Sequence, residues 1–451
     1  MPREENKMGV LPVKKLIISM SLPMMISMLV QALYNVVDSI YVARLSEAAL
    51  TSVTMAFPLQ NLMIALGSGT GVGINALLSR SLGEKRFERS DAAANNGLFL
   101  TVINYLIFLL TGLFASKAFI RTQTVSPELI SYGTTYLRIV CCMSFGLFFQ
   151  MTFERLLQST GRTLYSMISQ TVGAVINIIL DPIMIFGLLG CPKFGVAGAA
   201  YATVIGQCCA ALIGLSFNLK KNTDIRFSVN SILKPQADII KEIYFVGVPS
   251  ILMMSIGSLM TYMMNLILKT FSETAIAVFG VYFKLQSFFF MPVFGLNNGL
   301  IPVLAYNYGA RRKDRIREAL RFAIILAMSI MAVGTLVFEL FPAALLRMFD
   351  ASEDMILIGV PALRIICTSF TVAGACIAMG SIFQAFSQSF YSLIISVGRQ
   401  LLVLIPVAFL LSRLGNVKLV WLAFPIAEVV SFVLSLYFFR KLYRNTVEKM
   451  A

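Results

Sequence analysis

The sequence contains no histidine, only one tryptophan, and few charged residues for its length of 451. The lack of histidine excludes histidine-based catalytic triads, metal sites and proton relays, so any proton chemistry must use carboxylates. Charged residues make up 13% of the chain and hydrophobic residues 58%, whereas a soluble domain is about 25% charged. Lipid must therefore be the solvent for much of the surface.

Several motifs that would indicate an enzyme are also missing. Six of the seven cysteines lie in apolar stretches and none forms a C-x-x-C pair, which indicates packing residues rather than a disulfide framework. A glycine run at positions 67, 69, 71 and 73 lacks the Gly-Lys-Ser/Thr of a phosphate loop and is predicted to serve close helix packing. With no D-D-x-x-D-like acidic cluster either, we predict a non-enzyme without a cofactor or firm metal site, and no direct use of ATP.

Apolar runs long enough to cross a bilayer recur along the whole chain. The first follows Lys14 and Lys15 and is far longer than the core of a signal peptide, so it is predicted to remain as a span. At about 20 residues a crossing, the chain predicts an all-α integral membrane protein with twelve spans. They are residues 15–42, 49–79, 94–116, 132–154, 164–189, 196–218, 240–268, 275–306, 318–342, 356–380, 390–412 and 417–439.

The basic residues alternate between the loops. With the N-terminus inside, the inner segments hold roughly three times as many Lys and Arg residues as the outer ones, as the positive-inside rule requires. This distribution explains the net charge of +15 as membrane topology, so no nucleic-acid partner is predicted. Because twelve is even, both termini are predicted to be cytoplasmic.

The chain also repeats itself. Residues 46–93 align without a gap on residues 272–319 at an offset of 226, and the same offset places Pro23 on Pro249. The repeat predicts two pseudo-symmetric six-helix halves in the same orientation, a known plan of transporters. The predicted organisation is an N-terminal lobe at 1–218, a linker at 219–238 and a C-terminal lobe at 239–451.

Several segments together resemble the multidrug and toxic compound extrusion (MATE) family. The resemblance covers nearly the whole chain and is carried by SLPMMISMLVQALYNVVDSIYVARL at 21–45, GSGTGVGINALLSRSLGE at 67–84, LLQSTGR at 156–162, INIILDPIMIFGLLG at 176–190, GVAGAAYATVIGQ at 195–207 and FKLQSFFFMPVFGLNNGLIPVLAYNYGA at 283–310. It implies two lobes around a central cavity, alternating access, and export of organic compounds driven by H⁺ or Na⁺. It also implies a bacterial plasma-membrane protein that contacts lipid and works as a monomer.

Ionisable residues inside spans are costly and therefore indicate function. Asp38 shares one helical face of the first span with Gln31, Tyr34 and Asn35. Its alternative interpretation is a residue that reaches the interface near the outer end of the span.

Asp181 follows Asn177 by one turn on the fifth span, and Pro182 frees a backbone carbonyl beside it. In the family branch that this chain resembles, an aspartate on span 1 and an asparagine–aspartate pair on span 5 form the cation site. The resemblance thus implies that Asp38, Asn177 and Asp181 couple transport to H⁺, or alternatively to Na⁺. A purely structural hydrogen-bond network is the competing interpretation.

Other residues are weaker candidates. The cavity or substrate candidates are Thr203, Met253, Met260, Lys284 and Arg364, besides the polar face of span 1. Methionine suits a pocket for varied apolar ligands, although many methionines will face lipid. A basic side chain can also extend to the interface, and Arg399 and Glu428 are expected to pair. Pro23 and Pro249 are predicted hinges, with static kinks as the alternative.

Three rival functions differ from a multidrug exporter. A flippase or exporter of a lipid-linked or specific metabolite is the nearest, but it would be expected to have more spans and an arginine-rich cavity. A membrane-embedded transferase would need acidic metal ligands. A channel would need a filter-like loop, and none is evident in the sequence.

Overall fold

The structure is a computed structural model that describes residues 6–349 and 351–450. These ranges are helical and contain no strand. The first half contains α1 (Lys7–Val10), α2 (Val13–Leu45), α3 (Glu47–Gly83), α4 (Phe87–Phe114), α5 (Ser116–Arg121), α6 (Pro127–Cys142), α7 (Phe145–Ser159), α8 (Thr163–Phe186) and α9 (Val196–Lys221). After α10 (Val229–Leu233) follow α11 (Ala237–Lys269), α12 (Glu273–Gly309), α13 (Lys313–Leu340), α14 (Pro342–Arg347), α15 (Glu353–Cys367), α16 (Phe370–Ala385), α17 (Ser389–Val397), π-helix η1 (Gly398–Leu404), α18 (Ile405–Ser412), α19 (Val417–Val420), α20 (Ala423–Leu442) and π-helix η2 (Tyr443–Val447).

Ten helical segments of the described chain are long and apolar enough to cross a bilayer. Two further crossings are bent helix pairs, α6 with α7 at 45° and α15 with α16 at 47°. Counted this way, the described residues make up to twelve crossings, which agrees with the sequence prediction. Helices are expected because in hydrocarbon every backbone polar group must be satisfied within the segment.

The two bends are a feature that the sequence did not predict. Spans 132–154 and 356–380 were expected to be continuous, and the structure breaks both at positions related by the repeat. In the second break the hydroxyls of Thr368 and Ser369 each donate to the carbonyl three residues earlier, at 2.7 Å. Such bonds compete with helix hydrogen bonding, and because no proline or glycine lies at either break, the pattern of residues did not reveal them.

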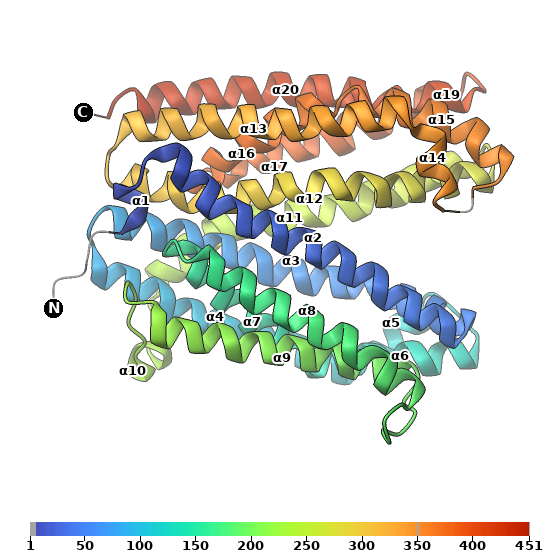
Figure 1. Ribbon diagram of the computed structural model, residues 1–451, viewed down its shortest axis with the longest axis horizontal. Coiled ribbons are helices and arrows are strands. Elements are labelled where there is room, and N and C mark those ends of the chain that lie inside the picture. The colour runs from blue at the N-terminus through green and yellow to red at the C-terminus, as the bar shows by residue number, and fades with distance from the viewer. Residues whose placement is uncertain (1–5, 350, 451) are drawn as a thin grey trace.

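The helices form two bundles that lie side by side (Figure 1). The first contains α3, α4 and α6 to α9, and the second contains α12, α13 and α15 to α20. Helix α2 runs diagonally between them: Val13 and Ile17 pack in the core of the second bundle, whereas Val42 packs in the first. Helix α2 thus connects the two lobes mechanically.

Glycines provide the closest contacts between the lobes. A Cβ atom at Gly73 of α3 would lie 2.1 Å from the carbonyl oxygen of Ile243 on α11. At Gly299 of α12, the repeat equivalent of Gly73, it would lie 2.7 Å from Ser21 on α2. The predicted role of the glycine run in close helix packing is therefore confirmed.

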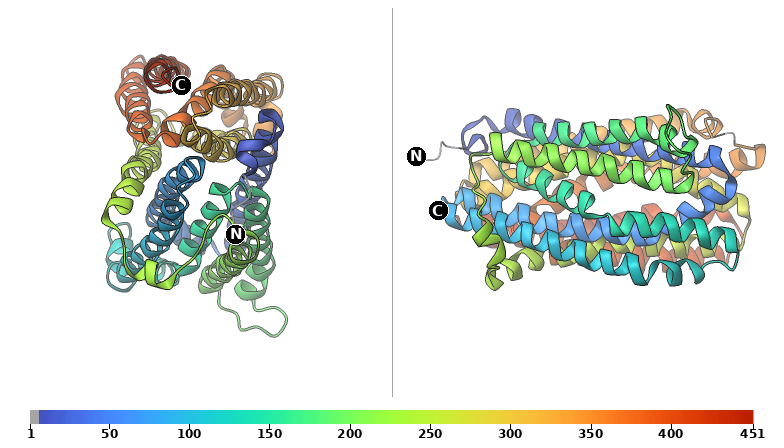
Figure 2. Two further views of the ribbon diagram at one scale, coloured as in Figure 1. Left: turned by 90° about the vertical axis from the view of Figure 1, so that its left-hand side faces the viewer. Right: turned by 90° about the horizontal axis from the view of Figure 1, so that it is seen from below.

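Both termini lie at the same end of the bundle, called here the terminal end (Figures 1 and 2). There the segment around α1 sits between the lobes: the side chain of Asn6 donates to the carbonyl of Thr160 at 2.9 Å, and Arg315 of α13 donates to that of Leu11 at 2.7 Å. Burial and the nearby Arg162 guanidinium lower the pKa of Lys7. The N-terminal segment is thus anchored to both lobes.

One buried ion pair stabilises the second lobe. Arg399, in η1, pairs with Glu428 of α20 at 3.1 Å, and only 8% of the Glu428 side chain is exposed. The expected pairing of these two residues is confirmed. Because π-helical turns insert an extra residue into the helix, η1 turns Arg399 toward α20.

Arg399→Met should destabilise the protein more than Arg399→Met combined with Glu428→Gln. The single change leaves a buried carboxylate without its cation, which costs about 3–5 kcal/mol, whereas the double change removes both charges. Thermal unfolding of the purified variants measures the difference. Equal unfolding temperatures for the two variants would contradict the role of the pair.

Candidate functional site

A cluster of polar side chains is buried between α8 and α9. Asn177 and Asp181 lie one turn apart on α8, and Asn177 contacts Thr203 of α9. With the Asn177 amide oriented to satisfy both neighbours, its nitrogen donates to Asp181 Oδ2 at 3.1 Å and its oxygen accepts from the backbone N–H of Thr203 at 2.9 Å. The side chain of Asp181 is fully buried.

Asp38 of α2 joins this cluster from the neighbouring helix. Its carboxyl group lies within interaction distance of that of Asp181, and the hydroxyl of Tyr34 lies close to Thr203. Helix α2 packs directly on α8, which brings together two carboxyl groups that are 143 positions apart in the chain. Two carboxyl groups this close can share a hydrogen bond only if one of them carries a proton.

Each of these carboxyl groups also has an oxygen without a partner. The Oδ1 atoms of Asp38 and Asp181 are buried and accept no hydrogen bond from the described residues, and neither group has an ion pair with a described Lys or Arg. Buried acceptors of this kind are costly. The two oxygens, with the Asn177 amide, are hard oxygen donors that suit H⁺ or Na⁺.

The structure adds two polar residues that were not predicted from the sequence, Tyr136 and Gln170. Tyr136 of α6 is buried within electrostatic range of Asp38 and accepts a hydrogen bond from Gln60 of α3 at 3.3 Å. Gln31 of α2 accepts from Gln170 of α8 at 3.2 Å. A tyrosine within an apolar helix gives no local signal, so Tyr136 could be assigned only from the packing.

Other predicted site residues lie elsewhere. Lys284 is exposed on α12, with its ammonium 6.0 Å from the centre of the Phe349 ring, and Arg364 pairs with the exposed Glu339 at 3.8 Å. Met260 is buried in the core of the second lobe. Asn35 is exposed. The remaining candidates are Met253, half-buried on α11, and the buried Pro23 and Pro249, which lie inside α2 and α11.

Arg155 forms a polar contact between the lobes. The predicted span 132–154 stops just before Arg155, but this residue lies in α7, one turn before the helix ends at Ser159. Its guanidinium donates to Ser68 of α3 at 3.4 Å and to Asn298 of α12 at 3.3 Å. The correction follows from helix length, because α7 continues past the apolar run that defined the span.

Two helical lobes joined through α2 and α11, with buried carboxyl groups inside one lobe, define a multi-span membrane transporter. The MatE family profile matches residues 23–183 and 249–410, two ranges that begin 226 positions apart as the repeat does. The chain therefore belongs to the MatE family, the MATE transporters that its sequence resembles.

Similar proteins and structures agree with this assignment. The chain is 28% identical over 438 residues to the multidrug export protein MepA of Staphylococcus haemolyticus, covering 96% of this chain and 95% of the relative. It is 27% identical to MepA of Staphylococcus aureus over 415 residues, covering 91% and 90%. A solved MATE multidrug resistance transporter in an outward-facing conformation superposes with a TM-score of 0.93 at 26% identity, with all of both chains covered.

A further solved relative indicates how far function varies within this fold. A transporter from Pyrococcus furiosus, whose structure is described as having a binding pocket of reverse polarity that suggests a different function, superposes with a TM-score of 0.92 at 26% identity over the full length of both chains. A shared fold therefore does not by itself determine what a transporter carries.

Proposed function

We propose that the protein exports small organic compounds, often cationic, across the cell membrane in exchange for H⁺, with Na⁺ as the alternative coupling ion. The observation that carries this proposal is the close pair of Asp38 and Asp181, whose buried Oδ1 atoms accept no hydrogen bond from the described residues. The export of drugs by similar proteins supports the choice of substrate class.

The coupling step follows from the cost of buried charge. Two ionised carboxylates in contact repel each other, so the pair retains one proton far more readily than an exposed aspartate does. Uptake of a second proton from outside removes the remaining negative charge, and with it the attraction for a cationic substrate. We infer that the substrate then leaves and that loss of the second proton on the inside restores the singly charged pair.

Helix α2 transmits this change to the rest of the molecule. It carries Asp38 near its far end, Pro23 in its interior, and a first turn that packs against the second lobe. A proline interrupts helix hydrogen bonding and provides a hinge. Solved MATE structures described as being in a straight and in a bent conformation are in keeping with such a hinge. Thr203, Met253 and the polar face of α2 remain candidates for substrate contact.

The membrane arrangement is part of the proposal. We place the terminal end in the cytoplasm, since the basic turns at Arg162 and Arg312 lie there beside the N-terminal segment. We infer that the protein acts as a monomer among membrane lipids, in the plasma membrane. Each monomer contains both carboxyl groups, so the site needs no second copy.

The test is dye efflux from vesicles that contain the purified protein. Ethidium efflux is measured with a pH gradient alone, a sodium gradient alone, and no gradient. Export that depends on the pH gradient supports H⁺ coupling, and export that depends only on sodium supports the alternative. If neither gradient drives any cationic dye, the multidrug proposal fails and a specific metabolite or lipid-linked substrate takes its place.

A further inference from the structure

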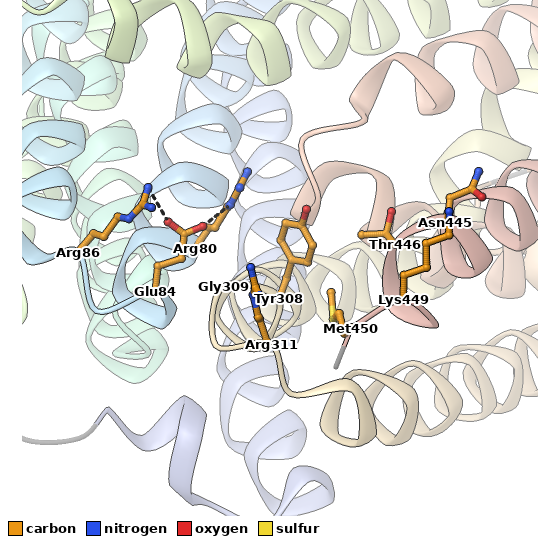
Figure 3. A pocket seen from close by; sticks show the side chains of 10 residues that line it. All are labelled: Arg80, Glu84, Arg86, Tyr308, Gly309, Arg311, Asn445, Thr446, Lys449 and Met450. Atoms are coloured by element: carbon orange, nitrogen blue, oxygen red, sulfur yellow. Dashed lines mark hydrogen bonds and ion pairs between the residues drawn. The ribbon is translucent and has the colours of Figure 1, made fainter.

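A pocket of about 510 Å³ opens at the terminal end, where the two lobes meet. Figure 3 shows that its side chains come from three segments: Arg80 and Arg86 from the end of α3 and the turn after it, Arg311 from the turn after α12, and Lys449 from the C-terminal segment. The pocket is thus shared between the first lobe and the second. Nothing in the export cycle described above uses it.

The pocket has a large excess of positive charge. Four of its lining residues are basic, whereas Glu84 is its one acidic residue among those described. Glu84 is already engaged by Arg80 at 2.8 Å and by Arg86 at 3.5 Å. Arg311 and Lys449 form no ion pair within the described ranges. Bringing these cations together when the lobes close is therefore unfavourable without an anion.

The internal repeat indicates what kind of group belongs there. At the offset of 226, Arg80 and Arg86 correspond to Tyr306 and Arg312 of the second half. Beside Tyr306 and Arg312, the N-terminal segment of the chain itself occupies the position that corresponds to the pocket. The side chain of Arg312 donates to the carbonyl oxygen of Gly9, and the Tyr306 ring lies against the same glycine.

On the pocket side no described backbone carbonyl accepts a hydrogen bond from the side chain of Arg86, the repeat equivalent of Arg312. The repeat equivalents of residues 8–11 are residues 234–237, and Gln236 is instead held against α4, where its backbone N–H donates to Asn96 at 2.8 Å. Arg311 and Lys449 are exposed at the pocket, so their donors can bind an acceptor from outside the protein. A group rich in oxygen and negative charge matches them, because guanidinium groups bind phosphate oxygens through paired hydrogen bonds.

We propose that this pocket binds a phosphate group, either a soluble phosphate or the headgroup of an anionic phospholipid, and that the bound phosphate holds the terminal end closed. The site is complete only when α3 and α12 touch, because each lobe contributes part of it. An anion that binds only the closed arrangement shifts the population toward it. The proposal does not depend on which ion drives export.

The test uses the full-length protein in phosphatidylcholine nanodiscs. Its unfolding temperature is followed as sodium phosphate is added, against sodium chloride at matched ionic strength. We expect the unfolding temperature to rise in a saturable manner with phosphate and not with chloride. Arg311→Gln with Lys449→Gln should weaken the response at least about tenfold, because both charge-assisted contacts to the phosphate are lost. Lys220→Gln with Lys221→Gln removes the same charge from exposed residues at the end of α9 and should leave the response intact.

A second arm distinguishes the two sources of phosphate. Nanodiscs containing phosphatidylglycerol should stabilise the protein without added phosphate if the headgroup is the ligand, and free phosphate should then add little. Spin labels are placed at Ser231 and Arg444, which are exposed residues at the terminal end. With the effective ligand, the mean distance between the labels should become shorter and the distribution of distances narrower. The proposal is overturned if the Arg311 and Lys449 double variant responds as the unmodified protein does. It is also overturned if neither free phosphate nor phosphatidylglycerol stabilises the unmodified protein.

Discussion

Asp181→Asn should reduce gradient-driven export to the level of empty vesicles, and Asp38→Asn should come close to it. Either change leaves a single carboxyl group in an apolar site. The remaining aspartate loses the neighbour whose charge favours proton retention, so it does not take up the proton that drives the cycle. Asparagine is nearly isosteric, so packing around the site should change little.

The measurement is efflux from vesicles, paired with thermal unfolding of the same preparations. Asp354→Asn is the matched control, because it removes one carboxylate from an exposed position at the start of α15. Stability of the two site variants should equal or exceed that of the unmodified protein, since a buried charge is removed. Full export by both site variants would refute coupling through this pair, and unfolding of either would assign it a structural role instead.

Gly309→Ala should strongly impair transport by preventing closure of the terminal end. A Cβ atom at Gly309 of α12 would lie 2.2 Å from the carbonyl oxygen of Arg80 on α3, and one at Gly83 only 1.9 Å from that of Tyr306. These two glycines are equivalents in the repeat and cross at the lobe junction. The contacts are with backbone, which cannot rotate away, so the helices must separate at a cost of about 1–3 kcal/mol or more.

Gly280→Ala on the same helix is the matched control. No atom lies within 4 Å of the position that its added methyl group would take, and alanine favours a helix over glycine by about 1 kcal/mol. Gly280→Ala should therefore keep transport and raise the unfolding temperature. Spin labels at Ser231 and Arg444 should report a longer distance in Gly309→Ala but not in Gly280→Ala. Unchanged distance and unchanged efflux in that variant would show that the glycine crossing does not control closure.

Much of the architecture could be predicted without tertiary structure. Every crossing must satisfy its backbone internally in lipid, so apolar length alone gave the twelve spans, and an ungapped repeat gave two similar lobes. Asp38 and Asp181 were identified for the same reason, because a carboxyl group within an apolar run is costly unless it has a function. These are local properties of the chain.

The tertiary structure decided the features that depend on partners far apart in sequence. Only packing of α2 on α8 brings Asp38 to Asp181 and adds Tyr136 from α6. Lys284 and Arg364 were equally unusual in sequence, but lie away from this cluster. The bends after Cys142 and Cys367, the crossing of Gly83 with Gly309 and the basic pocket beside it have the same origin. Hydropathy reports whether a residue prefers lipid, whereas these features depend on which backbone or charge lies opposite, and that is set by long-range packing.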